Sequence, residues 1–369
     1  MARLTDISLF LPSLRGGGAE RVMVTLANGF AERGISVDLV AAMAEGPYVE
    51  QVSSAVRIVD LKSPRILKSI LPLMQYLRKE RPKALLSTLR HANVAATIAH
   101  RLTRSDARLV LREASKVDKT DFPGIPGYLN LLLYKWAYNS ADSVVGISQG
   151  VSDDIRAIAK NSNVVTIHNP VDLERVQALS REPLIVDENI RNRGFILSAG
   201  RLTAAKDVPT LLHAFALIKD RTELYLVIIG EGELREELET LSRSLGIAER
   251  VLMPGFSANP YVWMRASRLF VLSSAWEGFP NALIEAMACG TPIVSTDCRN
   301  GPSEILEGGK WGRLVPVRDS LGLAAALQAA LADELLPNVR QRVEDFRKGR
   351  IMEKYASVLG LNLGVSVSS

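Results

Sequence analysis

The feature that most constrains the fold is an alternation of short apolar segments with longer segments whose apolar residues recur at helical spacing, and this alternation occurs twice along the chain. The first series has β-type segments at 7–11, 37–41, 84–88, 108–111 and 143–147. The second series has them at 195–199, 225–229, 251–253, 269–272 and 293–295. Such alternation predicts an α/β protein made of two facing Rossmann-like domains, each with a parallel sheet covered by helices on both faces.

The length of 369 residues also favours two domains, because a single hydrophobic core rarely grows beyond about 250–300 residues. We expect an N-terminal domain at 1–175, a polar linker at 176–193 and a C-terminal domain at 194–345. Residues 346–369 are expected to form a C-terminal helix and tail that pack back on the N-terminal domain. Open parallel sheets bind ligands at the carboxyl ends of their strands, so the two domains would enclose an interdomain cleft lined by strand ends.

The composition is typical of a globular protein, with 47% hydrophobic and 23% charged residues. No apolar run approaches the roughly 18 residues that span a bilayer. The apolar segment at 7–11 follows Asp6, which favours a strand over a signal peptide. Cys289 and Cys298 are too few for a disulfide framework or a Cys-rich metal site, and these features together predict a cytoplasmic protein.

The charge is distributed unevenly along the chain. Residues 1–172 carry 22 Lys and Arg against 16 Asp and Glu, whereas residues 173–369 carry 23 against 24. A basic first half predicts contact with nucleic acid or with an acidic membrane surface, although a merely solvated basic surface has the same composition. The chain has no zinc-finger spacing and no aromatic RNA-binding signature, which argues against nucleic acid.

Two glutamates stand eight positions apart in the segment EGFPNALIE. Glu277 falls in a loop after a predicted strand, and Glu285 falls one turn into a helix that Asn281 is expected to cap and Gly290 to close. Both carboxylates and the free backbone N–H groups of 279–283 are then expected at one strand end. Carboxylates accept hydrogen bonds from sugar hydroxyls and helix-start amides favour anions, whereas two solvated surface glutamates would show the same spacing.

Positive charge and glycine accompany other predicted strand ends. Arg201 and Lys206 follow the first strand of the second series, where two cations are suited to hold a pyrophosphate through charge-assisted hydrogen bonds. Gly16, Gly17 and Gly18 lie between a strand and a helix, where glycine lets the backbone approach a phosphate or a sugar closely. These glycines are contiguous rather than spaced as GxGxxG, which argues against a nicotinamide dinucleotide site.

These motifs resemble those of the retaining glycosyltransferases of family 4, which have the GT-B fold. The resemblance rests on GGAER at 17–21, on Gly200, Arg201 and Lys206 in the pattern GR-x4-K, and on Glu277 and Glu285 in the pattern E-x7-E. Further similar segments are GISQGVSDDI, TIHNPVD, IIGEGELREELE and CRNGPSEIL. The similarity covers most of the chain, is strong from Gly194 to Pro316, and is weaker from about residue 50 to 140.

The resemblance implies a role for each matching charged residue. Arg201 and Lys206 would bind the diphosphate of a nucleotide-sugar donor. Glu285 would accept hydrogen bonds from the ribose, and Glu277 would contact the transferred sugar as the side chain to which the rate is most sensitive. Such enzymes typically need neither metal nor cofactor, and the chain has no DxD motif at a predicted strand end.

The resemblance also implies backbone contacts. Sugar and phosphate oxygens would be bound by the backbone around the helix start, at Gly278, Phe279, Asn281, Ala282 and Leu283. Gly17 and Gly18 would close over the donor from the opposite domain.

The chain departs from the family pattern at one position. Many members carry a histidine after an N-domain strand, in contact with the donor sugar, whereas here the strand at 108–111 runs into Arg112 and Glu113. His91, after the strand at 84–88, is the nearby imidazole. We therefore take His91 and Glu113 as candidate sugar or acceptor contacts, with helix capping or a surface position as the alternative for His91.

Two segments combine apolar residues with basic or aromatic ones, RILKSILPLMQYLRKERPK and YLNLLLYKWAYNSAD. Both are compatible with helices that cover a sheet. The alternative is that part of this surface docks on the anionic inner face of the cytoplasmic membrane and admits a polyprenyl-linked acceptor. The resemblance favours this alternative, since similar enzymes often build bacterial surface polysaccharides on lipid carriers.

The sequence thus predicts a hexosyltransferase that moves a sugar from a nucleotide-diphosphate sugar to a glycan or lipid-linked acceptor, in the synthesis of lipopolysaccharide, capsule or exopolysaccharide. Two alternatives stay open. A GT-B-like nucleotide-sugar epimerase would turn over the donor without an acceptor. A non-catalytic sugar-binding regulator would bind sugar independently of nucleotide.

Overall fold

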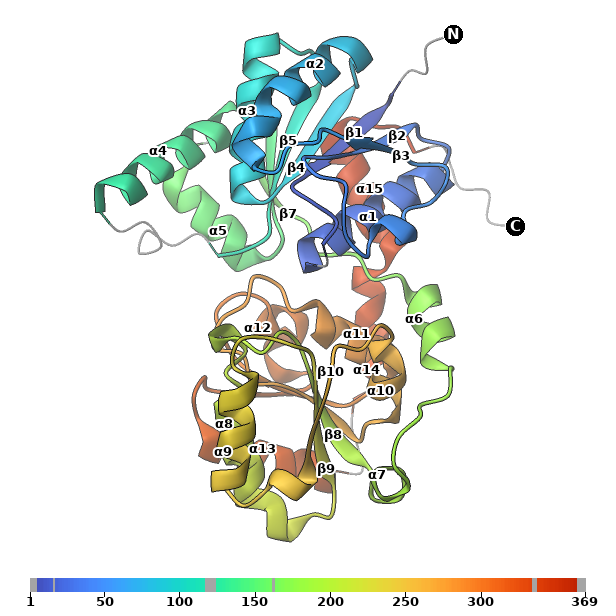
Figure 1. Cartoon of the computed structure of the whole chain (residues 1–369), viewed down its shortest axis with the longest axis vertical. Helices are drawn as coiled ribbons and strands as arrows, with labels where there is room; N and C mark the ends of the chain where they lie inside the picture. The colour runs from blue at the N-terminus through green and yellow to red at the C-terminus, as the bar shows by residue number, and fades with distance from the viewer. Residues whose placement is uncertain (1–4, 16, 117–123, 161–162, 334–336, 364–369) are drawn as a thin grey trace. The chain divides into compact units, whose positions relative to one another are not determined.

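The computed structural model describes residues 5–15, 17–116, 124–160, 163–333 and 337–363. The chain divides into two compact α/β units, each with one parallel sheet (Figure 1). Unit 1 comprises 1–170 and 348–369, and unit 2 comprises 171–347. The predicted α/β class with two Rossmann-like parallel sheets is confirmed.

Unit 1 contains a seven-stranded parallel sheet with the order β3-β2-β1-β4-β5-β6-β7. Its strands are β1 (Ile7–Leu11), β2 (Val37–Ala41), β3 (Arg57–Asp60), β4 (Ala84–Thr88), β5 (Arg108–Glu113), β6 (Ser143–Gly146) and β7 (Val164–Thr166). The sequence did not predict β3 and β7. β3 is a half-exposed edge strand and β7 has three residues, so neither forms a marked apolar segment.

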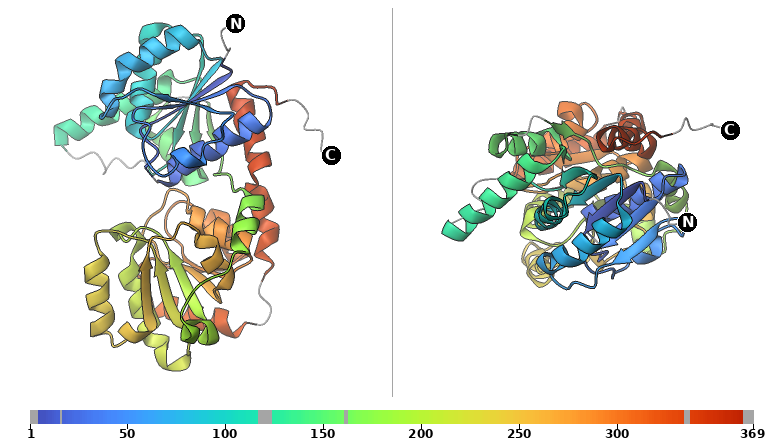
Figure 2. Two further views of the ribbon diagram at one scale, coloured as in Figure 1. Left: turned by 45° about the vertical axis from the view of Figure 1, so that its right-hand side comes forward. Right: turned by 90° about the horizontal axis from the view of Figure 1, so that it is seen from above.

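Helices cover both faces of this sheet (Figure 2). They are α1 (Gly18–Glu32), α2 (Ile70–Glu80), α3 (Arg90–Thr103), α4 (Gly124–Ser140), α5 (Gln149–Ile158) and α15 (Lys348–Leu359), with the 3-10 helices η1 (Val49–Gln51) and η2 (Ile66–Ser69). α1 and α15 share a hydrophobic core with alternate strand residues such as Ile7, Leu9 and Leu11. Alternate residues of a strand point to the same face, so this core lies on one side of the sheet.

The C-terminal helix α15 belongs to unit 1. Ile351, Met352 and Tyr355 are at most 1% exposed and lie in the core shared with α1. The Tyr355 hydroxyl also accepts a hydrogen bond of 3.1 Å from Nε of the buried Arg112. Residues 346 and 347 remain with unit 2, so the chain passes from unit 2 to unit 1 after Arg347.

Unit 2 contains a six-stranded parallel sheet with the order β10-β9-β8-β11-β12-β13. Its strands are β8 (Phe195–Ala199), β9 (Tyr225–Ile229), β10 (Val251–Gly255), β11 (Leu269–Leu272), β12 (Ile293–Thr296) and β13 (Arg313–Val315). The longer helices α8 (Val208–Ile218) and α13 (Ser320–Ala332) contact each other and share one hydrophobic core with the strands. The remaining α-helices are α6 (Leu173–Ser180), α7 (Glu188–Arg193), α9 (Arg235–Ser244), α10 (Pro260–Ala266), α11 (Asn281–Cys289), α12 (Pro302–Ile305) and α14 (Val339–Val343).

The segment 176–193, expected to be a linker, is instead part of unit 2 and contains most of α6 and all of α7. α6 packs on α10 and α11 through the buried side chains of Leu173 and Val176. The prediction failed because these few apolar residues stand among charged ones. The segment is polar on average, although its helix buries one narrow apolar face.

Replacing Ile351 with alanine tests the membership of α15 in unit 1. The Ile351→Ala variant should lose about 2–5 kcal/mol of stability, because it leaves a cavity in a fully buried core. Hydrogen exchange should show the lost protection in unit 1 and unchanged protection in unit 2. Glu353→Ala changes an exposed residue on the same helix and serves as the control. It should change neither the stability nor the protection of unit 1. Loss of protection confined to unit 2 would contradict this assignment.

Candidate functional site

Unit 2 brings loops from two neighbouring strands to the carboxyl edge of its sheet. β8 and β11 are adjacent, and the strand order reverses between them. The loop after β8 carries Arg201 and the 3-10 helix η4 (Ala204–Lys206), and the loop after β11 carries Glu277. Open parallel sheets bind ligands at such a reversal because the flanking loops diverge there and leave room between them.

Lys206 and Glu277 form an ion pair although they stand 71 positions apart in the sequence. The Lys206 ammonium donates to Oε1 of Glu277 over 2.5 Å. The same oxygen accepts a hydrogen bond of 2.7 Å from the Ser274 hydroxyl. The side chains of Lys206 and Glu277 are 24% and 12% exposed, so water and salt screen their attraction less than they would at an open surface.

Arg201 lies on the same loop as Lys206, and its side chain is exposed. Within the described residues the Arg201 guanidinium forms no hydrogen bond or ion pair. Its backbone surroundings are tightly packed, because a Cβ added at Gly230 (φ +137°) would lie 1.9 Å from the Gly200 carbonyl oxygen. A guanidinium without a carboxylate partner, next to a tightly packed backbone, is suited to bind an anionic ligand.

Glu285 lies on α11 and is 8% exposed. Of the four predicted charged residues, the structure joins Lys206 and Glu277 directly. The helix ends at Gly290, whose φ of 83° places it in the left-handed region, and this confirms the predicted helix end.

The start of α11 differs from the prediction. The helix begins at Asn281, and Pro280 rather than Asn281 takes the N-cap position. Proline has no N–H, and the Leu283 amide donates to the Pro280 carbonyl over 3.0 Å, so neither residue offers an amide to a ligand. The predicted row of amides is therefore interrupted at Pro280 and Leu283.

Phe279 and Gly278 connect Glu277 to this helix. Phe279 is 6% exposed, and its ring packs edge-to-face on the ring of Phe346, 5.8 Å away. Gly301 approaches the same loop so closely that an added Cβ would lie 3.3 Å from the Phe279 Cα. The Phe279 side chain therefore anchors the loop inside unit 2, and Gly278 lies half-buried between it and Glu277.

The glycine segment belongs to unit 1. Gly16 lies outside the described residues, Gly17 is the N-cap of α1, and Gly18 is the first residue of that helix. The Glu20 carboxylate lies against Gly17, because a Cβ added at Gly17 would be 2.1 Å from Glu20 Oε2. An acidic group in the first turn is stabilised by the positive end of the helix.

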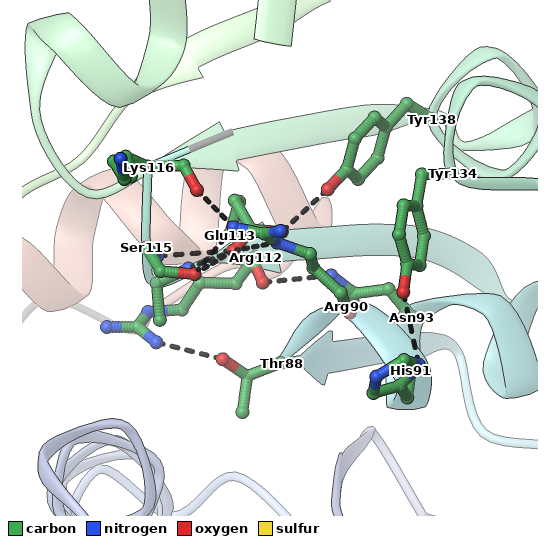
Figure 3. A network of polar contacts seen from close by, with 11 residues as sticks. Thr88, Arg90, His91, Asn93, Arg112, Glu113, Ser115, Lys116, Tyr134 and Tyr138 are labelled. Atoms are coloured by element: carbon green, nitrogen blue, oxygen red, sulfur yellow. Dashed lines mark hydrogen bonds and ion pairs between the residues drawn. The ribbon is translucent and has the colours of Figure 1, made fainter. Parts of the chain in front are cut away.

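A polar network occupies the carboxyl ends of β4 and β5 in unit 1 (Figure 3). Arg112 has no exposed surface and donates to Thr88 Oγ1 over 2.9 Å and to Asn169 Oδ1 over 2.5 Å. Glu113 also has none, and it accepts hydrogen bonds from Ser115 Oγ at 3.0 Å and from the Tyr138 hydroxyl at 2.6 Å.

This burial corrects the role expected for Glu113. The prediction assumed that the strand ends at residue 111, whereas β5 continues to Glu113 and carries both charged residues inside the sheet. Burial and the neighbouring Glu113 carboxylate raise the pKa of Tyr138 well above its ordinary value, so the hydroxyl remains a hydrogen-bond donor to Glu113. A carboxylate enclosed in this way stabilises unit 1 and does not reach a substrate.

His91 lies in the first turn of α3 and is exposed. Its Nδ1 lies 3.1 Å from the hydroxyl of Tyr134 on α4 (Figure 3). Tyr134 is 4% exposed, so this contact joins α3 to α4 at the border of the core.

The sequence reasoning overlooked Ser273 and Ser274, which follow β11 directly and are 2% and 0% exposed. Their position after a buried strand, at the edge where ligands bind, was the available signal. No group of three His, Cys, Asp or Glu residues in the described part of the chain is placed to hold a metal ion. Likewise, no described helix has the length and apolar character required to cross a membrane.

Comparisons with known families agree with this architecture. The family described as Glycosyltransferase Family 4 matches residues 16–175, and the family described as Glycosyl transferases group 1 matches residues 180–348. HepE of Anabaena, solved in complex with UDP and glucose, is structurally similar with a TM-score of 0.80. That likeness covers 96% of this chain and 99% of HepE at 21% sequence identity.

Relatives of known sequence extend the comparison. One is the N-acetylgalactosamine-N,N'-diacetylbacillosaminyl-diphospho-undecaprenol 4-alpha-N-acetylgalactosaminyltransferase of Campylobacter jejuni, which is 31% identical over 90% of this chain and 92% of its own length. Another is the lipopolysaccharide core biosynthesis glycosyltransferase LpsE of Rhizobium meliloti, 27% identical over 87% of this chain and 88% of its own length. The chain therefore belongs to the family 4 glycosyltransferases and is a glycosyltransferase with the GT-B fold.

Proposed function

We propose that the protein is a retaining glycosyltransferase that moves a sugar from a nucleotide-diphosphate sugar to a glycan or lipid-linked acceptor during the synthesis of a cell-surface polysaccharide. The observation that carries this proposal is the partly buried Lys206–Glu277 pair, which lies at the carboxyl edge of unit 2 together with the unpaired guanidinium of Arg201. Cations that can bind a diphosphate thus stand beside a carboxylate that can accept hydrogen bonds from sugar hydroxyls.

Each part of the donor is assigned to the residues whose charge or hydrogen-bonding groups suit it. Arg201 and Lys206 bind the diphosphate and stabilise the negative charge that grows on it as the sugar leaves. Glu277 accepts hydrogen bonds from the sugar, and its negative charge opposes the positive charge that develops on the ring. Glu285, four residues after the start of α11, accepts hydrogen bonds from the ribose.

The reaction proceeds on one face of the sugar. The bond between the anomeric carbon and the diphosphate oxygen breaks, and a bond from the same carbon to the acceptor oxygen forms. The leaving diphosphate takes the acceptor proton, so the chain supplies orientation and charge stabilisation and does not supply a strong base.

The relatives support an acceptor on a lipid carrier. The name of the Campylobacter jejuni enzyme describes an undecaprenol diphosphate-linked acceptor, and the Rhizobium meliloti protein acts in lipopolysaccharide core synthesis. Transfer to a lipid-linked acceptor requires the enzyme to work at a membrane surface.

One surface of unit 1 has the exposed apolar and basic side chains expected for docking on an anionic membrane. The α4 apolar face comprises residues that are 40–59% exposed, namely Tyr128, Leu129, Leu132, Leu133 and Trp136. Leu67 and Leu71 near the start of α2 are 62% and 69% exposed and lie beside the exposed Arg65 and Lys68. α3 contacts both η2 and α4, so both elements lie beside the same helix. Apolar side chains beside lysine and arginine favour an interface with acidic lipids.

Other residues of the two predicted amphipathic segments serve the core. Leu73, Leu77 and Tyr134 are at most 4% exposed. The inner faces of α2 and α4 therefore cover the sheet, and the proposal concerns their outer faces.

The diphosphate assignment is tested by donor binding. A thermal-shift screen with UDP-, GDP- and ADP-sugars should identify a stabilising donor. Arg201→Ala and Lys206→Ala should each weaken its binding about 10- to 100-fold, because a hydrogen bond to a charged group contributes roughly 1.5–3 kcal/mol. The control is Arg268→Ala. Arg268 is exposed and lies just before β11, at the opposite end of the strand, so this variant should bind the donor as the unmodified protein does. Equal donor binding by all three variants would contradict the assignment.

Replacing Glu277 with glutamine tests its role in the chemical step. Glu277→Gln keeps the shape of the side chain and removes its charge, so kcat should fall about 100-fold or more while the KM for the donor changes little. Steady-state release of nucleoside diphosphate with saturating acceptor measures both parameters. A variant that retains its kcat would exclude Glu277 from transition-state stabilisation.

Membrane docking is tested by co-sedimentation with vesicles. The protein should bind phosphatidylglycerol-containing vesicles at low salt and release them at high salt. It should not bind vesicles of pure phosphatidylcholine. The double variant Leu129→Ser/Leu133→Ser should bind several-fold less. Leu217→Ser, which changes a half-exposed leucine on α8 of unit 2, should bind as the unmodified protein does. Failure to bind anionic vesicles at low salt would exclude docking.

A further inference from the structure

Two consecutive serines follow β11, and each forms a hydrogen bond with one member of the Lys206–Glu277 pair. Ser273 Oγ donates to the backbone carbonyl of Lys206 over 2.8 Å. Ser274 Oγ donates to Oε1 of Glu277 over 2.7 Å. The serines are 2% and 0% exposed, so neither side chain can contact a substrate, and any effect on the reaction must pass through Lys206 or Glu277.

The two hydrogen bonds at Oε1 orient the Glu277 carboxylate. Ser274 and Lys206 both donate to Oε1, whereas Oε2 has no hydrogen-bond partner within the described residues. A carboxylate held by one oxygen presents the other in a defined direction. The side chain retains 12% exposure, so a ligand hydroxyl can reach it.

The segment after β11 is itself joined to the segment that carries Lys206. The Ala275 amide donates to the Ala205 carbonyl over 2.8 Å, one residue before Lys206. From β12, Thr296 Oγ1 donates to the Ser274 carbonyl over 2.6 Å. These contacts fix the backbone around both serines, which is the condition for precise orientation of a functional side chain.

Donor binding creates a competition for Lys206. The Lys206 ammonium bonds to Glu277 Oε1, and a bound diphosphate would attract the same positive charge. If Lys206 alone held the carboxylate, Glu277 could rotate when the donor binds. The Ser274 hydroxyl is neutral and enclosed, so it keeps its bond to Oε1 while the lysine turns to the phosphates.

We propose that Ser273 and Ser274 are positioning residues with separate tasks, an inference that rests on the proposed function. Ser274 holds the Glu277 carboxylate toward the sugar, and it therefore acts on the chemical step. Ser273 holds the backbone of Lys206 in reach of the diphosphate, and it therefore acts on donor binding.

Alanine variants of the two serines separate these tasks. With the donor that gives the largest thermal shift, Ser274→Ala should lower kcat about 10-fold and leave the donor Kd within twofold. Ser273→Ala should raise the donor Kd about 5- to 10-fold and leave kcat within twofold. The control is Ser267→Ala, which removes another buried hydroxyl. Ser267 lies before the other end of β11 and donates to the Met264 carbonyl, so its loss should change neither kcat nor the donor Kd.

A double-mutant cycle distinguishes this inference from the proposed function. Because the Ser274 hydroxyl acts through the carboxylate, Ser274→Ala/Glu277→Gln should be no slower than Glu277→Gln alone. Additive losses, or a Ser274→Ala variant that behaves as Ser267→Ala does, would overturn the positioning role while leaving the proposed function intact. Unchanged kcat in Glu277→Gln itself would refute both the function assigned to the pair and this inference.

Discussion

The ion pair between Lys206 and Glu277 is the interaction on which the site depends. It connects loops from two strands that are adjacent in the sheet but separated by β9, β10 and three α-helices in the sequence. Its partial burial makes it stronger than a surface pair, and its hydrogen bond from Ser274 reduces the cost of removing the carboxylate from water. A glycosyltransferase that uses it needs no rearrangement to bring cation and carboxylate together.

The carboxyl ends of the two parallel sheets place charged residues in different environments. In unit 2 the carboxyl edge keeps Arg201 exposed and Glu277 partly accessible, so charge is available to a ligand. In unit 1 the carboxyl ends of β4 and β5 direct Arg112 and Glu113 into a closed network of hydroxyl and amide partners, which also includes an ion pair of 3.7 Å between Arg90 Nε and Glu113 Oε1. The buried network encloses these charges at the carboxyl ends of two central strands.

Much of the fold could be predicted because buried parallel strands are continuous apolar segments. Every strand predicted from the sequence lies within an observed strand or overlaps one. The short strands β3, β7 and β13 and the helices α6 and α7 were missed, since a few buried side chains among polar ones leave little signal. The helix that Asn281 was expected to cap begins at Asn281 itself, because Pro280 takes the N-cap position.

The sequence by itself indicated the fold class, the family resemblance and the residue types of the candidate site, because hydrophobic periodicity and motifs are local properties of the chain. It also placed Lys206 and Glu277 after predicted strands, and the sheet order made those strands neighbours. The tertiary structure decided that Lys206 pairs with Glu277 and that Glu113 is enclosed. It also decided that Ser273 and Ser274 form hydrogen bonds with the pair. Those outcomes depend on burial and on contacts between distant segments, and sequence spacing does not encode how far a strand continues or which hydroxyl a fold brings within 3 Å of a carboxylate.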